Sequence, residues 1–218
     1  MLALSDTCTA ALNGRGGLCG CLTATALGRL RAVAGDVRLD AGQTLFAAGT
    51  VADSLFGVRQ GAVMLVRRLD DHRRHILSFH FSGDMLGFAA DGVHQVSAVA
   101  LGHASLCRIP LSEMERDLAL GRHVLGILHR TLGHALEMEV RLGRMSAAER
   151  VRALLGELHR RLGGGDELHL PMRIADLADH LGLRPETVSR ELSALRHAGL
   201  VGSVTPDGVL PILDPSAL

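Results

Sequence analysis

Apolar side chains recur every three or four residues in the C-terminal third of the chain, which predicts helices there. Over residues 183–200, Val188, Leu192 and Leu195 fall on one helical face at about 100° per residue. Pro185 suits the first helical position, and Gly199 suits the position just past the helix end. The pattern therefore predicts an amphipathic helix that packs one face on the rest of its domain.

The polar face of this predicted helix carries Glu186, Ser189 and Arg190, at spacings i, i+3 and i+4. Arg can bond guanine O6 and N7 bidentately, Glu can accept from cytosine N4, and Ser can do either. The three residues are therefore candidate DNA-binding residues that read double-stranded DNA. The alternative is a solvated helix face with no ligand, and the neighbouring elements favour the DNA interpretation.

Those neighbours predict a winged helix. Residues 174–182 form a short apolar-periodic segment that ends at Gly182, so the pair has helix-turn-helix form. Downstream, residues 200–204 and 209–213 flank a Thr-Pro-Asp-Gly sequence with the chemistry of a hairpin turn.

Between residues 37 and 109 the pattern changes to short strands separated by glycine, which predicts a closed β-roll. The expected strands are 43–46, 54–60, 62–67, 74–81, 96–101 and 104–109. A short helix over 23–33, with Leu27 and Leu30 pointing inward, is expected before them. Ser112 and Glu115 form a possible capping box for a short helix after them.

A long helix is predicted from about Arg122 to Met145, and it carries two neighbouring apolar stripes. One stripe could cover the chain's own β-roll while the other meets a second copy. A helix buried on two sides within one chain is the alternative. The homodimer is favoured because a helix-turn-helix domain usually needs a dyad to read two half-sites. The stripes are Val124, Ile127, Thr131, His134, Met138 and Met145, and Leu125, Leu128, Leu132, Ala135 and Leu142.

The expected fold class is thus α+β, in four segments. Residues 1–22 form a Cys-bearing N-terminal segment, 23–118 a β-roll sensor domain, 119–146 the dimerisation helix and 147–218 the winged-helix domain. Ser146 and Glu149 predict a capping box at the start of the last segment.

Composition and charge restrict the partners, the location and the activity that we expect. The 218 residues carry a formal net charge of +0, and from Ala147 onward Asp and Glu outnumber Arg, which is weak evidence against a nucleic-acid partner. No targeting segment and no membrane span is expected, so we expect a cytoplasmic protein without a membrane partner. No Ser/His/Asp set, phosphate-binding loop or paired carboxylates indicates an enzyme.

The chain resembles the CRP/FNR superfamily of transcription regulators, and its FNR branch in particular. The resemblance is carried by GQTLFAAG from Gly42, FSGDMLGF from Phe81, SLCRIP from Ser105 and ETVSR from Glu186. It implies a cyclic-nucleotide-binding-like β-roll and a homodimer that binds an inverted repeat of a TTGAT-like half-site through Glu186, Ser189 and Arg190. It also implies RNA polymerase as a partner.

The resemblance also has implications for the ligand or cofactor that the predicted sensor domain binds. Between His75 and Cys107 there is no Arg or Lys, so a cyclic nucleotide would lack the cation that its phosphate needs. Cys107 stands where FNR keeps its central cluster-binding cysteine, and Cys8, Cys19 and Cys21 offer three more thiolates, which implies an oxygen-responsive 4Fe–4S cluster. The alternatives are a buried core Cys107, a thiol redox switch, haem-based nitric oxide sensing, and a protein-interaction module that does not bind DNA.

Overall fold

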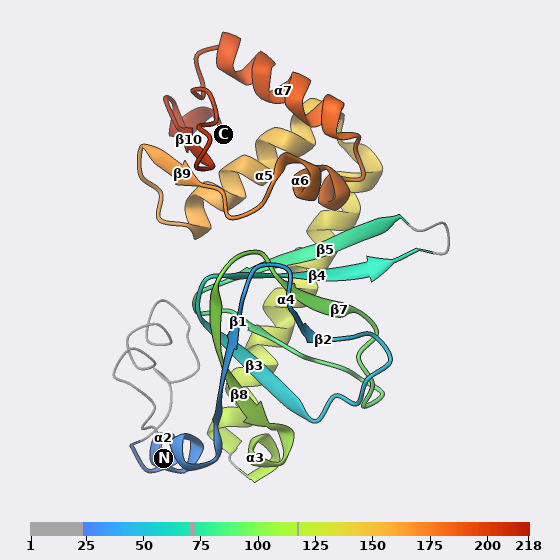
Figure 1. Cartoon of the computed structure of the whole chain (residues 1–218), viewed down its shortest axis with the longest axis vertical. Coiled ribbons are helices and arrows are strands. Elements are labelled where there is room, and N and C mark those ends of the chain that lie inside the picture. The colour runs from blue at the N-terminus through green and yellow to red at the C-terminus, as the bar shows by residue number, and fades with distance from the viewer. Residues whose placement is uncertain (1–23, 70–72, 117) are drawn as a thin grey trace. The chain divides into compact units, whose positions relative to one another are not determined.

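The computed structural model describes residues 24–69, 73–116 and 118–218. They divide into two compact units, one ending at Gly133 and the other beginning at His134. The first unit is mainly β-structure and the second is mainly helical with a small sheet (Figure 1). The expected α+β fold class, with a β-roll followed by a long helix and a winged helix-turn-helix, is confirmed.

Two antiparallel four-stranded sheets build the first unit. Each expected strand overlaps an observed one, whereas β1 and β6 were missed, because β6 has only two residues and β1 carries charged side chains. One sheet has the order β1 (Gly35–Leu39), β8 (Ala104–Pro110), β3 (Ser54–Gln60) and β6 (Met85–Leu86). The other has the order β2 (Thr44–Phe46), β7 (Ser97–Ala100), β4 (Ala62–Arg68) and β5 (Arg74–Phe81).

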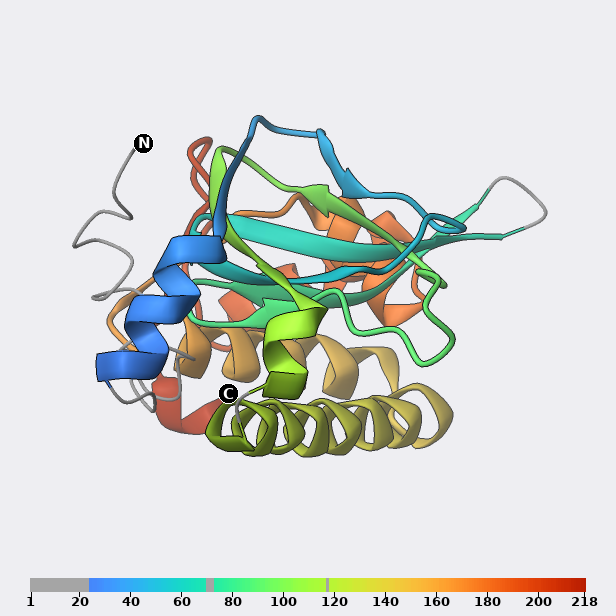
Figure 2. The ribbon, with the colours of Figure 1, turned by 90° about the horizontal axis from the view of Figure 1, so that it is seen from below.

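Side chains from both sheets pack face to face in one apolar core. Phe56 and Leu106 contribute from the first sheet, and Phe46 and Val63 from the second. The outer face of the first sheet carries a second apolar cluster, in which Leu30 of helix α2 (Ala24–Val33) and Ile127 of helix α4 (Leu118–Arg144) cover Leu55, Met85, Cys107 and Ile109. Figure 2 shows α2, α3 (Leu111–Arg116) and the first part of α4 gathered on this side.

Some sequence-based expectations fall outside what the structure describes. Leu30 is buried at 5% exposure, as expected, but the side chain of Leu27 is not described, and neither is that of Glu115. Residues 1–22, with Cys8, Cys19 and Cys21, lie outside the described residues.

The second unit holds α5 (Ala147–Arg161), β9 (Glu167–His169), α6 (Ile174–Leu181), α7 (Pro185–His197), β10 (Val209–Pro211) and a 3-10 turn at Pro215–Ala217. The capping box that opens α5 is confirmed. The Ser146 backbone N–H donates to Glu149 Oε2 at 2.8 Å, and the Glu149 N–H donates to Ser146 Oγ at 3.3 Å. The first bond, followed by the bond from the Ser146 hydroxyl, lowers the pKa of Glu149.

The wing differs in part from the expected hairpin. Strand β10 pairs with β9, which was not expected, while the predicted partner segment joins through the Val201–Ile212 bridge and a bond from the Gly202 N–H to the Pro211 carbonyl at 2.8 Å. Strand β9 has three residues and pairs with a segment far along the chain. A local pattern therefore could not reveal it.

Arg150 of α5 ties three helices together. Its guanidinium donates to the carbonyls of Leu142 at 2.6 Å, Met145 at 2.9 Å and Leu181 at 3.2 Å. The last carbonyls of a helix have no partner within it, so a cation placed there stabilises the helix end. Arg150 thereby binds the C-terminal ends of α4 and α6 to α5.

Candidate DNA-binding interface

Helix α7 begins and ends where its sequence directs. Pro185 occupies the first turn, after Arg184 in an extended conformation. At the other end Gly199 has φ +72°, its N–H donates to the Arg196 carbonyl at 3.0 Å, and the Leu200 N–H donates to the Leu195 carbonyl at 3.0 Å. This pair of bonds is the Schellman motif, which requires the left-handed residue that glycine supplies.

The turn before α7 fixes how the two helices meet. Gly182 has φ 62° and ends α6, and the Leu183 N–H returns to the Ala178 carbonyl at 3.0 Å. The buried carboxylate of Asp176 accepts the backbone N–H of Arg173 at 2.9 Å and so closes the start of α6. Helix α7 packs against both α5 and α6, which confirms the helix-turn-helix.

The two faces of α7 separate as expected. Val188 is 0% exposed and Leu192 is 8% exposed, while Leu195 is half-buried. Glu186, Ser189 and Arg190 are all exposed. The structure therefore brings the three candidate base-reading side chains together on the solvent face of one helix.

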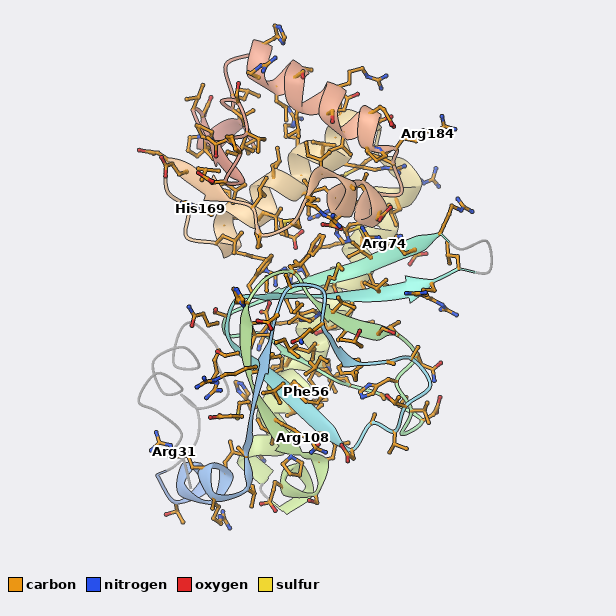
Figure 3. All side chains as sticks on the ribbon, viewed as in Figure 1. Arg31, Phe56, Arg74, Arg108, His169 and Arg184 are labelled. Atoms are coloured by element: carbon orange, nitrogen blue, oxygen red, sulfur yellow. The ribbon has the colours of Figure 1, made fainter. Side chains whose placement is uncertain are left out.

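Further arginines of the second unit are exposed, although the net charge of this part of the chain gave no sign of them. Arg173, at the start of α6, has a side chain that is 80% exposed. Arg184 is exposed and projects beside the start of α7 (Figure 3). Arg196 donates to Ser203 Oγ at 3.2 Å and links α7 to the wing segment. Cations at helix starts suit DNA phosphates, because backbone N–H groups there also favour anions.

One contact on α7 had no signal in the sequence. The Arg190 guanidinium donates to Glu191 Oε1 from Nη2 at 3.3 Å and from Nε at 3.4 Å. Residues at i and i+1 do not face each other on a helix, so spacing gives no reason to pair them. The contact is possible because the long, flexible Arg190 side chain can reach the carboxylate of its neighbour.

Helix α4 has a buried and an exposed apolar face, but the exposed residues match the predicted stripe only in part. Ile127 is buried and Val124 packs with it in the outer cluster of the β-roll. Apolar side chains on another face of α4 are exposed, namely Leu125 (53%), Leu128 (38%), Leu132 (57%), Leu136 (56%) and Val140 (56%). Leu136 and Val140 belong to the exposed row without having been predicted, and Leu142 of the predicted stripe is half-buried. A row of exposed Leu and Val along one helix is unfavourable in water, and such apolar patches are often found at interaction sites.

Cys107 lies inside the outer cluster of the β-roll, at 2% exposure. On the same sheet, the side chain of Arg59 on β3 reaches over β8 to β1. Its Nη1 lies 2.8 Å from Asp36 Oδ1, and its Nη2 donates to the Leu106 carbonyl of β8 at 3.3 Å. Among the described residues, no group of three or more His, Cys, Asp or Glu could hold a metal ion.

The described packing around Cys107 is that of an apolar core and not that of an open metal site. Closely packed interiors have no spare volume, so a cluster bound to this sulfur would have to displace Leu30, Ile127 or their neighbours. The described surroundings are those of a core cysteine. The three N-terminal cysteines of the expected ligand set lie outside the described residues.

The segment between β6 and β7 supplies no cation for a cyclic nucleotide. Residues 87–96 contain no Arg or Lys, and their His94 is 4% exposed and stacks on Phe46 with ring centroids 3.7 Å apart. Burial lowers the pKa of His94, which Asp53 only partly offsets. A neutral ring in an apolar stack is a poor partner for a phosphate.

The fold and this surface define a class of protein: a β-roll of the cyclic-nucleotide-binding type joined to a winged helix-turn-helix domain. Two family models match the chain, a cyclic nucleotide-binding domain over residues 36–119 and a Crp-like helix-turn-helix domain over residues 149–218. No described helix has the length and apolar character needed to span a lipid bilayer.

Similar proteins of known identity show which family within this class the chain belongs to. The nitrogen fixation regulation protein FixK of Rhizobium meliloti is 35% identical over 177 residues, covering 81% of this chain and 82% of the relative. FixK of Bradyrhizobium diazoefficiens is 34% identical over 207 residues, covering 91% and 86%. The structure of FixK2 from Bradyrhizobium japonicum has a TM-score of 0.78 at 32% identity, covering 83% of this chain and 92% of that one. The chain belongs to the CRP/FNR family of DNA-binding transcription regulators, which are not enzymes.

Proposed function

We propose that this regulator binds an inverted-repeat DNA site with TTGAT-like half-sites as a homodimer, through Glu186, Ser189 and Arg190. The observation that carries the proposal is their common exposure on the outer face of α7, whose other face is buried. Arg173 and Arg184 add contacts to the DNA backbone, because both are exposed cations at helix starts.

The exposed Leu and Val row of α4 supports the homodimer. A second copy of the same helix offers a row of the same chemistry, so the two rows can bury each other around a twofold axis. Two recognition helices related by that axis can then read two half-sites. RNA polymerase, as the further partner that the family resemblance implies, stays a prediction.

The proposal also concerns which ligand or cofactor this regulator uses to sense its signal. A 4Fe–4S cluster on Cys8, Cys19, Cys21 and Cys107, with oxygen sensing, stays a prediction from the family resemblance. The filled apolar surroundings of Cys107 favour the alternative in which the regulator works without a cluster. The segment between β6 and β7, which lacks a cation, argues equally against a cyclic nucleotide.

Replacing Arg190 by Ala tests the proposed function. The wild-type protein should prefer an inverted repeat of TTGAT over the same duplex with one base pair of each half-site changed. Arg190→Ala should remove about 1–3 kcal/mol of that preference at one position of the half-site. Arg160→Ala, which removes an exposed arginine of α5 instead, should keep the preference. Equal affinity of the wild-type protein for every duplex would overturn the proposal.

A further inference from the structure

The contact between Arg190 and Glu191 leaves one edge of the guanidinium open. Glu191 Oε1 takes the Nε hydrogen and one Nη2 hydrogen, at 3.4 Å and 3.3 Å. A guanidinium has five N–H donors in a fixed planar fork. The end formed by Nη1 and the outer Nη2 hydrogen therefore remains available for a second bidentate partner.

That open end has the geometry needed for guanine. Guanine presents O6 and N7 side by side in the major groove, and two parallel N–H groups can meet both. The carboxylate and the base would thus occupy different edges of one guanidinium, so neither excludes the other.

Glu191 is more buried than the residue it contacts. Its side chain is 16% exposed, whereas that of Arg190 is 72% exposed. A long exposed Arg side chain loses rotamer entropy when it is fixed on a base. A carboxylate held against the protein surface can reduce that loss by restricting the guanidinium before DNA arrives.

We propose that Glu191 is a positioning residue for Arg190, an inference that rests on the proposed function. It limits the directions that the guanidinium takes, and thereby increases the discrimination of the base pair that Arg190 reads. The same carboxylate repels DNA phosphates, so it raises specificity while it weakens general affinity for DNA.

The experiment measures base preference rather than affinity alone. Each protein is titrated with two duplexes, an inverted repeat of TTGAT and the same repeat with G replaced by A in each half-site. Glu191→Gln should lower the ratio of the two affinities by about three- to tenfold, a fraction of the discrimination that one bidentate pair supplies. Affinity for the substituted duplex should stay the same or rise. Glu191→Asp, which keeps the charge, should restore part of the ratio.

Three controls make the outcome decisive. Glu167→Gln removes the same charge from an exposed position of the second unit and should leave the ratio unchanged. In an Arg190→Ala background, Glu191→Gln should have no further effect on the ratio. Circular dichroism melting shows that each variant is folded.

An unchanged ratio in folded Glu191→Gln, with a wild-type protein that prefers the TTGAT repeat, overturns this inference and leaves the proposed function standing. A ratio that falls equally in Glu167→Gln also overturns it. A wild-type protein without any preference overturns the proposed function and this inference together.

Discussion

The Arg141 guanidinium of α4 donates to the Glu157 carboxylate of α5 across 2.6 Å, and both side chains are largely buried, at 11% and 18% exposure. Arg161 lies 3.5 Å from the other carboxylate oxygen. Burial raises the pKa of Glu157, but the hydrogen bond from Arg141 and the charges of Arg141, Arg161 and His134 outweigh it, so the pKa lies below 4.5. The pair joins the last part of α4 to α5 within the second unit.

Glu157→Ala should destabilise this unit by about 2 kcal/mol, because it leaves the nearly buried Arg141 without its main partner. Urea unfolding followed by circular dichroism measures the loss. Glu137→Ala is the matched control, since Glu137 lies 4.0 Å from Arg141 and is 66% exposed. Its cost should be less than about 0.5 kcal/mol. Equal costs for the two variants would contradict this assignment.

The Glu157 pair also predicts a dependence on pH. A carboxylate whose pKa is lower in the folded than in the unfolded state stabilises the fold above its unfolded value of 4.5. That contribution is lost as the pH falls through the lowered folded value. Between pH 7 and pH 3 the urea midpoint should therefore fall further for the wild-type protein than for Glu157→Gln.

His94 predicts a second loss of stability as the pH falls, in a range that begins near pH 6.5, above that of Glu157. Burial lowers its pKa below 6.5, so the unfolded chain takes up a proton more readily than the folded one. The neutral ring thus stabilises the β-roll above pH 6.5, and the contribution falls as the pH drops from 6.5 through the folded value. In His94→Leu the urea midpoint should depend less on pH over this range. An identical dependence in the variant and the wild-type protein would refute the argument.

Leu132→Glu should weaken the proposed dimer, because Leu132 is 57% exposed in the α4 row and a carboxylate there would be buried against a second copy. Sedimentation at micromolar concentration should show dimers for the wild-type protein and mainly monomers for the variant. Arg130→Glu places a carboxylate at an exposed position on a different face of the same helix and should leave the dimer intact. A wild-type monomer would exclude this role for the row.

Cys107→Ala separates the core interpretation of Cys107 from the cluster hypothesis. For a core residue, we expect a destabilisation of about 1 kcal/mol from the lost sulfur contacts. After anaerobic purification, iron content and absorption near 400 nm should then be the same in the variant and the wild-type protein. If the wild-type protein holds about four irons per chain and the variant does not, the cluster hypothesis is supported and the core interpretation is wrong.

Local chemistry determined the start and end of the functional elements. Ser146 and Glu149 cap α5, and Gly199 ends α7, because these signals act within a few residues and need no distant partner. The helical period alone also placed Glu186, Ser189 and Arg190 on one face, opposite Val188 and Leu192.

Only the tertiary structure decided which strands pair and which side chains contact each other. Strand β9 exists because β10 pairs with it, and the surroundings of Cys107 depend on helices that come before and after its strand. The bond from Arg141 to Glu157 joins two helices, and the contact between the neighbours Arg190 and Glu191 depends on the rotamers of both side chains. Such contacts depend on packing and on rotamers, which a pattern of residue types does not record.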